Sequence, residues 1–346
     1  MEEENNKHVH FMRRALELAT LGSGHVSPNP LVGCVVVCGE KILGEGWHKI
    51  LGGPHAEVHA LQSVADPSRL KESTVYVNLE PCSHQGRTPP CADLLIQHQV
   101  KKVVVANLDP NPKVNGEGIK KLRSAGIEVV TGIMAEEGRR LNKRFFTFME
   151  KQRPFFVLKW AATADGFMAQ SNGDSKWISH ARSRQLVHKW RSEEDGVLVG
   201  MKTAFHDNPR LTVRDWSGRN PVRIVIDRFL KLHDSLSLFD QSTLTLCYNV
   251  LKHEERDNLI YLRKDEEGFM EQVVADLYQR QIQSVMVEGG SITLQHFIDL
   301  RLWDEVREFV SRRTFGQGLK APVFQGLSIS REILDGDVLT IYHPLN

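Results

Sequence analysis

The sequence predicts two α/β domains in tandem, and three observations lead to this fold class. The chain has 346 residues, a length that suits two domains of ordinary size. Strand-like apolar runs alternate with helix-like segments through both halves, a pattern typical of layered α/β domains. The charged stretch "KQRP" (151–154) interrupts this alternation and ends in proline. We therefore expect one domain over residues 1–150 and a second over residues 151–346.

The elements of the first half follow from apolar periodicity and from turn residues. Helices are expected where apolar residues recur at helical spacing, and strands where short apolar runs end at glycine or polar residues. A glycine closes the helix predicted over 116–126, which is a common stop signal. The predicted helices are 9–22, 55–65, 91–100, 116–126 and 135–152, and the predicted strands are 31–37, 41–47, 73–80, 101–108 and 127–133.

The same alternation restarts after Pro154, which predicts a second core. The predicted strands are 155–163, 195–200, 221–227, 284–290 and 304–311, and the predicted helices are 179–192, 268–280 and 291–300. The sequence has no internal repeat and no low-complexity segment.

Composition excludes several classes of partner. The chain is 41% hydrophobic and 25% charged, which is typical of globular proteins, and its formal net charge is +1. This balance gives no indication of a nucleic-acid partner or of a membrane surface. No apolar run approaches the roughly 20 residues of a membrane span, and the acidic N-terminus lacks the apolar core of a signal peptide. We expect a cytoplasmic protein that binds neither nucleic acid nor membrane.

The five cysteines fall into two groups. An odd number in a chain expected to be cytoplasmic argues against a disulfide framework. Cys34, Cys38 and Cys247 lie in apolar runs, where cysteine behaves as a small buried hydrophobe. Cys82 and Cys91 each follow a proline in a polar loop, so they need another explanation.

The stretches "GGPHAEVHAL" and "EPCSHQGRTPPC" together predict a zinc site. Catalytic zinc uses three protein ligands, drawn from imidazole, thiolate and carboxylate, and keeps one position for water. The candidate ligands are His55, Cys82 and Cys91. His55 follows one proline and Cys91 another, so each is expected to begin a helix, where the positive end of the helix dipole favours a thiolate.

Glu57 is the candidate catalytic residue of this site. In the first turn of a helix, His55 and Glu57 can both reach an atom beyond the helix end, although they would not face each other further along. Glu57 can then take a proton from the attacking water and pass it to a leaving nitrogen. The zinc nucleobase deaminases use this chemistry, with the signature H-x-E followed by P-C-x-x-C.

Two other types of zinc site are less consistent with these residues. A metalloprotease helix would pair His55 with His59, but its H-E-x-x-H pattern needs glutamate directly after the first histidine, where this chain has alanine. We expect His59 to lie on a helix face and to form a structural hydrogen bond. A purely structural zinc knuckle would leave Glu57 without a role.

Eight residues, "SHQGRTPP", separate the two cysteines instead of the two in the general deaminase signature. With this loop, "SPNPLVGCVVV", "GWHKILGGPHAEVHAL", "EPCSHQGRTPPC" and "DPNPKVNGEGIKKLRSAGIEV" resemble, in order, the deaminase half of the RibD family of bifunctional riboflavin-biosynthesis enzymes. The resemblance implies a three-layer, cytidine-deaminase-like domain that acts on a diaminopyrimidinone carrying phosphoribosylamine. His84 and Arg87 are donors suited to a phosphate or a ring carbonyl, and Asn29 could bind a pyrimidine edge; surface or turn roles are equally open for all three.

The second half resembles the reductase of the same family, whose fold is similar to dihydrofolate reductase. The stretches that carry this resemblance are "KWAATADGFMA", "SKWIS", "AFHDNPRLTVR", "RIVID" and "VEGGSITL". The resemblance implies contacts with NADPH from Ala161, Trp177, Thr203, Asp207, Gly290, Ser291, Ile292, Thr293, Leu294, Gln295 and His296. It implies contacts with the substrate from Ser175, Arg191, Leu211, Arg214 and Glu288.

The residues themselves support parts of this assignment. "VEGG" between a strand and a helix suits a phosphate at the helix start, but it is not the G-x-G-x-x-G of a Rossmann fold. Arg191 and Arg214 can each bind a phosphate with two hydrogen bonds. Arg228 stands where many relatives have a hydroxyl residue, and it could meet the 2′-phosphate of NADPH or lie exposed. Asp165 and Glu288 are both candidates for the proton donor, and the sequence does not distinguish them.

Together these observations predict a bifunctional enzyme with Zn²⁺ and NADPH as cofactors, phosphorylated pyrimidine substrates and a homo-oligomeric assembly. One alternative is a nucleoside or tRNA deaminase with an appended binding domain; the lack of a basic patch argues against RNA, and the long cysteine loop against cytidine. Another is a scaffold protein with a structural zinc site. Glu57 and the set of reductase motifs argue against it.

Overall fold

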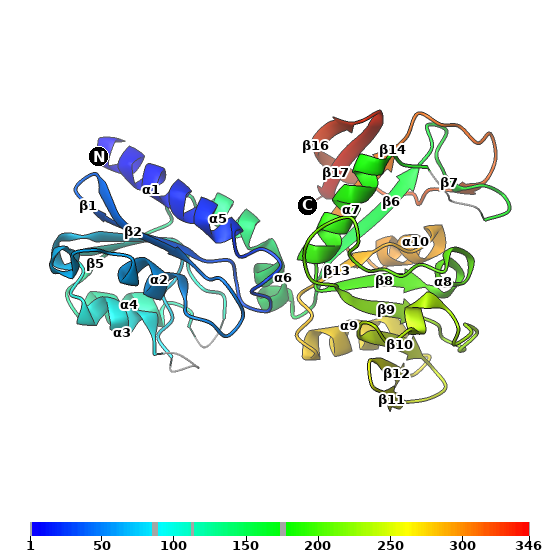
Figure 1. Ribbon diagram of the computed structural model, residues 1–346, viewed down its shortest axis with the longest axis horizontal. Coiled ribbons are helices and arrows are strands. Elements are labelled where there is room, and N and C mark those ends of the chain that lie inside the picture. The colour runs from blue at the N-terminus through cyan, green and yellow to red at the C-terminus, as the bar shows by residue number, and fades with distance from the viewer. Residues whose placement is uncertain (1, 85–88, 112–113, 174–177, 346) are drawn as a thin grey trace. The chain divides into compact units, whose positions relative to one another are not determined.

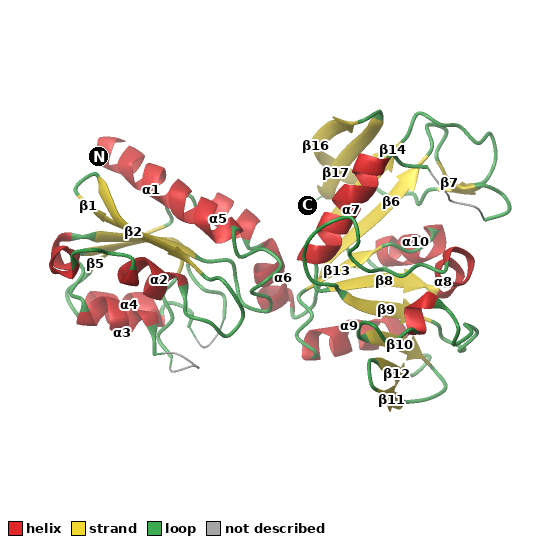
Figure 2. Cartoon of the chain, viewed as in Figure 1, coloured by secondary structure: helices red, strands yellow, loops and turns green. Residues whose placement is uncertain are grey.

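The structure, a computed structural model, describes residues 2–84, 89–111, 114–173 and 178–345 (Figure 1). The chain divides into two compact units, Met1–Lys151 and Gln152–Asn346. Both units are layered arrangements of helices and strands, so the predicted α/β class is confirmed (Figure 2). No helix within the described ranges combines the length and the apolar character needed to cross a membrane.

The first unit is built on a five-stranded sheet of order β2-β1-β3-β4-β5. Strand β1 runs antiparallel to β2 and β3, whereas β3, β4 and β5 are parallel. The strands are β1 (Gly33–Cys38), β2 (Lys41–Trp47), β3 (Thr74–Leu79), β4 (Lys102–Asn107) and β5 (Glu128–Thr131). The helices are α1 (Glu2–Thr20), α2 (Ala56–Gln62), α3 (Cys91–Gln97), α4 (Glu117–Ser124), α5 (Ala135–Leu141) and α6 (Lys143–Lys151), with a 3-10 helix at Pro67–Glu72.

Helices cover both faces of this sheet, which makes the unit three-layered (Figure 1). Successive strand residues point to opposite faces, so Val36 and Val77 pack with α2, α3 and α4, while Val35 and Tyr76 pack with α1. Helix α5 lies on the same side as α1. Strands buried on both faces explain why β1, β3 and β4 read as nearly continuous apolar runs.

The second unit is built on a ten-stranded sheet of order β11-β12-β10-β9-β8-β13-β6-β14-β17-β16. The strands from β12 to β14 in this order are parallel, and antiparallel strands complete both edges. The strands are β6 (Phe155–Ala162), β7 (Phe167–Ala169), β8 (Gly196–Gly200), β9 (Val222–Ile226), β10 (Thr245–Asn249), β11 (Glu254–Arg256), β12 (Leu259–Arg263), β13 (Ser284–Val287), β14 (Glu305–Val310), β15 (Leu319–Lys320), β16 (Gly326–Leu334) and β17 (Asp337–Pro344). Strands β7 and β15 form a separate two-stranded sheet.

Helices again lie on both faces of the large sheet. The helices are α7 (Ala181–Glu193), α8 (Met201–Asp207), α9 (Phe269–Gln279) and α10 (Ser291–Asp299), with a 3-10 helix at Ser237–Phe239. Helices α9 and α10 pack on one face, and α7 and α8 pack on the other. Strand β8 leads directly into α8, and three residues connect β13 to α10. Two helix starts therefore follow the carboxyl ends of adjacent parallel strands, where α/β folds commonly bind ligands.

The predicted single helix over 135–152 is wrong, because α5 ends at Leu141 and α6 begins at Lys143. Between them lies Asn142, which is buried and whose side chain bonds to the main chain of Leu31. Its Oδ1 accepts from Leu31 N at 2.8 Å, and its Nδ2 donates to Leu31 O at 2.9 Å. This long-range pair of hydrogen bonds fixes the chain at the junction of the two helices.

The hairpin of β16 and β17 was not predicted from the sequence. Leu327, Ile329 and Ile333 of β16 alternate with other residues at strand spacing, but nearly every residue of β16 is exposed, so this strand is not part of a buried core. The three cysteines of the apolar runs lie largely as expected: Cys34 and Cys247 are buried, and Cys38 is half-buried. All five cysteines are free thiols.

Candidate active sites

Strand β2 holds helix α2 close enough to place His55. A Cβ atom on Gly46 would lie 2.4 Å from Ala60 N and 2.6 Å from Ala56 O, so only glycine lets the two main chains approach this closely. His55 is the residue just before α2 and has an extended conformation, with φ −73° and ψ 166°. Its ring therefore projects from the start of the helix and not from its side.

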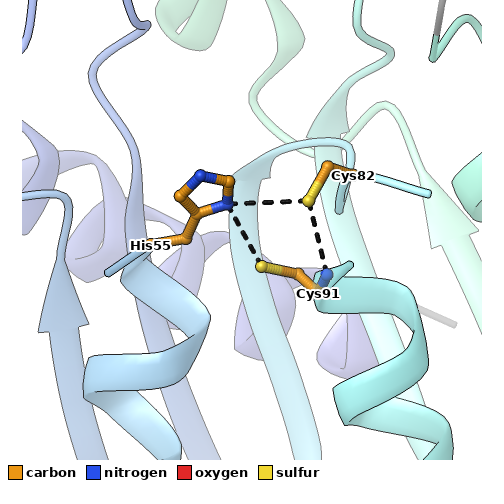
Figure 3. Close-up of side chains that lie close together, drawn as sticks. All are labelled: His55, Cys82 and Cys91. Carbon is orange, nitrogen blue, oxygen red and sulfur yellow. Dashed lines mark hydrogen bonds between the residues drawn. The ribbon is translucent and has the colours of Figure 1, made fainter. Parts of the chain in front are cut away.

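His55, Cys82 and Cys91 converge on one point (Figure 3). His55 Nδ1 lies 3.6 Å from Cys82 Sγ and 3.3 Å from Cys91 Sγ, and the three donor atoms lie within 4.8 Å of one another. Cys91 is the first residue of α3, and its N–H donates to Cys82 Sγ at 3.3 Å. Tetrahedral zinc with normal bond lengths would hold a nitrogen and a sulfur about 3.6 Å apart. The donor set and its spacing therefore fit zinc.

Glu57 lies in the first turn of α2, buried to 3% exposure, beside these donors. Burial raises the pKa of its carboxyl to about 6, and the neighbouring Cys82 adds to this effect. Hydrogen bonds from Cys91 and His55 favour the thiolate form of Cys82 and lower the pKa of that thiol despite its burial. The site thus combines a ligand set with a carboxyl group that is suited to exchanging protons.

A second histidine, His48, lies behind the ligand set. Its ring packs edge-on against that of His55, with centroids 5.6 Å apart. His48 Nδ1 lies 3.0 Å from Pro54 O and its Nε2 lies 3.1 Å from Asn29 Nδ2. Burial lowers the pKa of His48, so the neutral ring donates from Nδ1 to the carbonyl and accepts at Nε2 from the Asn29 amide. This orientation leaves Asn29 Oδ1 as an acceptor, with no partner among the residues described.

In the second unit, the starts of α8 and α10 meet. Gly290 N donates to Thr203 Oγ1 at 2.7 Å, and a Cβ on Gly200 would lie 2.2 Å from Thr293 Oγ1. These contacts bring together Thr203, Gly290 and Thr293, three of the candidate residues for cofactor binding. The glycines let the two helix starts lie close together, and helix starts favour phosphate groups such as those of a dinucleotide.

The other candidate cofactor residues are placed as follows. Ala161 lies near the end of β6, and Asp207 is the last residue of α8. Ser291, Ile292, Gln295 and His296 lie on α10 with side chains that are half-buried or exposed. Leu294 is fully buried in the core, so only its main chain could reach a ligand.

Glu288, just after β13, forms the centre of a buried charge cluster. Arg191 of α7 binds it with two hydrogen bonds, from Nε at 2.6 Å and from Nη2 at 2.9 Å, and Lys159 Nζ of β6 lies 3.5 Å away. Burial alone would raise the pKa of Glu288, but Arg191 and Lys159 together lower it to about 2. Burial lowers the pKa of Lys159. The acidic proton of this cluster therefore resides on the lysine.

The segment after α8 joins this cluster. Arg191 Nη1 donates to Thr212 O at 3.3 Å, and Arg214 Nη1 donates to Thr212 Oγ1 at 3.1 Å. The Arg214 guanidinium has no ion pair within the described ranges, so it remains available to an anion. Leu211 has a left-handed φ of 53° and a side chain buried in the core, so any contact with a ligand would come from its main chain.

Asp165, the other candidate proton donor, lies in a different arrangement. Its carboxylate accepts hydrogen bonds from Thr163 Oγ1 at 2.5 Å and from the N–H groups of Phe315 and Gly316. The bond from Thr163 and those from the two amides lower its pKa. An ionised, tightly bonded carboxylate cannot serve as a proton donor, so the geometry favours a role for Asp165 in holding the turn.

Family models match both units. The model described as "Cytidine and deoxycytidylate deaminase zinc-binding region" matches residues 5–107, and the model described as "RibD C-terminal domain" matches residues 154–340. The RibD protein of Aquifex aeolicus is 41% identical over 327 residues, covering 89% of this chain and 88% of the relative. The chain belongs to the RibD family.

Other relatives agree with this membership. RibD of Escherichia coli is 36% identical, with 89% of this chain and 88% of the relative covered. The crystal structure of a diaminohydroxyphosphoribosylaminopyrimidine deaminase/5-amino-6-(5-phosphoribosylamino)uracil reductase from Thermotoga maritima is similar with a TM-score of 0.91 and 38% identity, over 99% of this chain and all of that one. RibD of Acinetobacter baumannii is similar with a TM-score of 0.90 and 34% identity, over 99% and 100% of the two chains.

As a member of the RibD family, the chain is a bifunctional enzyme of riboflavin biosynthesis, with a zinc-dependent deaminase and an NADPH-dependent reductase. This confirms the predicted function, both cofactors and the two predicted folds. The family's substrates are of the pyrimidine nucleotide type.

Several predicted RibD site residues lie outside the described residues or away from the two clusters. Arg87, Ser175 and Trp177 lie outside the described ranges. His84 is exposed on the loop after β3. His59 is half-buried on α2, but its predicted structural hydrogen bond is not found within the described residues.

Arg228 is exposed two residues after the end of β9. Its guanidinium lies 5.1 Å from the ring centroid of Phe269 and 5.8 Å from that of Phe229. No ion pair of Arg228 is found in the part of the chain that the structure covers. A phosphate group could therefore approach it without displacing a carboxylate.

Sequence reasoning missed His48 and Lys159. Both stand within the stretches that resemble the RibD family, "GWHKILGG" and "KWAATADG". A histidine or lysine in such a stretch carries no spacing signal by itself, because its partners come from distant segments: Asn29 for His48, and Glu288 for Lys159.

Proposed function

We propose that residues 1–150 hydrolytically deaminate 2,5-diamino-6-(5-phosphoribosylamino)pyrimidin-4(3H)-one to 5-amino-6-(5-phosphoribosylamino)uracil, and that residues 151–346 reduce the ribosyl group of this product to ribityl. The relative from Thermotoga maritima carries this pair of activities in its name. The observation that carries the proposal is the convergence of His55, Cys82 and Cys91 beside the buried Glu57.

In the deaminase, His55, Cys82 and Cys91 would hold the zinc ion, with His55 binding through Nδ1. Bound zinc supplies a water whose pKa is lowered to about 7. Glu57 accepts a proton from the attacking water and returns it to the exocyclic nitrogen, which leaves as ammonia. Its position in the first turn of α2, buried beside the three ligands, suits a group that takes a proton from one atom of the site and gives it to another.

Asn29 would orient the pyrimidine. Because His48 engages the amide nitrogen of Asn29, Oδ1 can accept a hydrogen bond from a ring N–H or an amino group. Arg87 and His84 on the long loop would approach the ribose phosphate.

In the reductase, bound NADPH would supply the hydride that reduces C1′ of the ring-opened ribosyl group. Thr203, Gly290 and the first turn of α10 would bind the cofactor phosphates, and Ala161 and Asp207 would line the same site, together with Trp177 and residues 291–296. Arg214 would bind the substrate phosphate, since Arg191 is already held by Glu288. Ser175 and Leu211 would complete the substrate contacts.

Lys159 is the proton donor that this geometry favours over Asp165 and Glu288. Its pKa is lowered by burial, so its protonated form is lost as the pH rises through that lowered value. The reductase rate should therefore fall on the alkaline side, and Lys159→Gln should slow reduction by about 10²-fold, the lower end of the range for general acid catalysis, and remove this alkaline limb. A pH profile of NADPH oxidation with deaminated substrate measures both effects. An unchanged profile in the variant would assign the proton to another group.

Arg228 supplies the preference for NADPH over NADH in this proposal. Its guanidinium is exposed and free of ion pairs within the described residues, and a charge-assisted hydrogen bond to the 2′-phosphate is worth about 1.5–3 kcal/mol. Arg228→Ala should weaken NADPH binding by about tenfold to a hundredfold and leave NADH binding nearly unchanged. Cofactor titration followed by protein fluorescence measures both affinities. Unaltered NADPH affinity would mean that another cation recognises the phosphate.

A coupled assay tests the whole function. The purified protein with the diaminopyrimidinone ribotide should release ammonia, and NADPH absorbance should then fall in step with the deaminated product. Ammonia release from cytidine or from tRNA, without NADPH oxidation, would favour the alternative of a nucleoside or tRNA deaminase.

We also propose a homo-oligomer and a cytoplasmic location. The outer strand β16 exposes Leu327, Ile329 and Ile333 along a sheet edge, a surface that proteins commonly cover. The relatives are biosynthetic enzymes, which favours the cytoplasm. Sedimentation of the purified protein tests the first proposal, and cell fractionation tests the second.

A further inference from the structure

Glu80 is a buried carboxylate that no step of the proposed chemistry uses. It follows β3, two residues before Cys82, and it is 4% exposed. Its Oε2 accepts from Asp109 N at 3.2 Å and from Gly116 N at 2.9 Å. Its Oε1 accepts from Gly118 N at 2.9 Å and from Ile119 N at 3.3 Å. One side chain thus satisfies four main-chain donors between β4 and the first turn of α4.

These four bonds press the chain before Cys82 against the start of α4. A Cβ on Gly118 would lie 2.1 Å from Pro81 O, so the two main chains are in direct contact at this point. The main chain of Glu80 is also fixed, because its N–H donates to Asn107 O at 2.9 Å. Pro81 leaves little freedom in the link to Cys82. A displacement of Glu80 would therefore shift the main chain that leads to Cys82.

The same carboxylate also holds a second segment of the first unit, at Asp109. Asp109, whose N–H it binds, is buried, and its own Oδ1 accepts from Asn111 N at 2.8 Å. Glu80 thus connects the segment before Cys82, a candidate zinc ligand, with the segment at Asp109.

We propose that Glu80 is a positioning residue of the deaminase, which holds the Cys82 ligand and the segment at Asp109 in register with each other. The inference rests on the proposed role of Cys82 as a zinc ligand. A buried carboxylate is costly unless hydrogen bonds satisfy it, and here both oxygens are used on the loop that borders the site. Helix capping alone would need only the bonds to Gly118 and Ile119, whereas the bonds to Asp109 and Gly116 reach the preceding loop.

The test compares Glu80→Gln with Glu117→Gln. Glutamine keeps the shape of Glu80 but turns an N–H₂ group toward main-chain donors, so the four bonds cannot all form. Glu117 is an exposed carboxylate in the first turn of the same helix, paired with Lys120, so its variant removes the same charge without touching the site. We expect Glu80→Gln to release zinc to a coloured chelator about 10- to 100-fold faster than the native enzyme, as for other residues that orient metal ligands. Glu117→Gln should release zinc at the native rate.

If Glu80 had only a structural role, the variants would give a different result. Glu80→Gln would lower the melting temperature of the zinc-free and zinc-loaded enzyme equally and leave zinc release and the deaminase KM unchanged; that result would overturn the inference. The proposal instead expects the stabilisation by zinc to shrink and the KM to rise, while reduction of separately supplied deaminated substrate stays at the native rate. Glu80→Asp, which keeps the charge but shortens the reach, should recover part of the loss.

Two further variants test separately whether Glu80 acts on Cys82 and whether Cys82 is a zinc ligand. They also provide a test if Glu80→Gln does not fold. Gly118→Ala keeps the Glu80 carboxylate, but its added Cβ would lie 2.1 Å from Pro81 O and 3.1 Å from Glu80 Oε1, so it should displace the segment before Cys82 and also speed zinc release. Native release from this variant would contradict the coupling to Cys82. Cys82→Ser should lose zinc altogether. Full zinc retention there would refute the ligand assignment itself, whatever Glu80→Gln does.

Discussion

Glu57→Gln is expected to keep zinc and fold while deamination falls by about 10²- to 10⁴-fold, the usual contribution of general acid–base catalysis. Glutamine is nearly isosteric with glutamate, so the buried position at the start of α2 is preserved. An amide cannot accept a proton from water and release it to a leaving nitrogen. Ammonia release under saturating substrate, together with zinc content by metal analysis, measures both parts of the expectation.

The reductase provides the control for this variant. Glu57 belongs to the first compact unit, and the Glu288 cluster belongs to the second. NADPH oxidation with separately supplied deaminated substrate should therefore continue at the native rate. Deamination within about twofold of the native rate would remove Glu57 from the proton-transfer steps.

Cys91→Ser is expected to lose most of its zinc, and with it the deaminase activity. The thiolate at the start of α3 is a far stronger zinc ligand than a hydroxyl group, and His55 and Cys82 alone cannot complete a three-ligand site. Metal analysis after dialysis against a weak chelator measures the loss. The reductase should again be unaffected.

His59→Gln is the matched variant for this experiment. His59 lies on α2, one turn after His55, but outside the group of converging donors. It should keep a full complement of zinc. Full zinc in Cys91→Ser, or zinc loss in His59→Gln, would contradict the assigned ligand set.

Most strands that are buried on both faces were predicted from the sequence, although β10, whose residues are all buried, and its neighbour β12 were not. Strands β3, β4 and β8 are short apolar runs because helices cover both sides of their sheets, and such runs can be recognised without a structure. The junction at Asn142 could not be found this way. Its cause is a pair of hydrogen bonds to Leu31, more than a hundred residues away in the chain.

The two candidate sites also differ in how far local sequence predicts their residues. His55 and Cys91 were recognisable because each sits at a helix start signalled by a proline, so local sequence determined their placement. Lys159 was not, because its lowered pKa depends on burial and on the distant Glu288 and Arg191. The choice of Lys159 over Asp165 as the proton donor depends on contacts between residues far apart in the chain, and apolar periodicity in the sequence cannot predict such contacts.

The junction at Asn142 also bears on where this enzyme could be divided into two polypeptides. Helix α6 is joined to the first unit through Asn142 and Leu31, and its Phe145 and Phe146 are buried beside Leu79 at the end of β3. A polypeptide that ended at Leu141 would lack these two aromatic rings, which pack beside the strand that leads to Cys82. A chain ended after Lys151 keeps them. Splitting the gene in two, or fusing two genes into one, would therefore disrupt the fewest contacts in the few residues between α6 and β6. A separately encoded deaminase would be expected to retain α6 as its last helix.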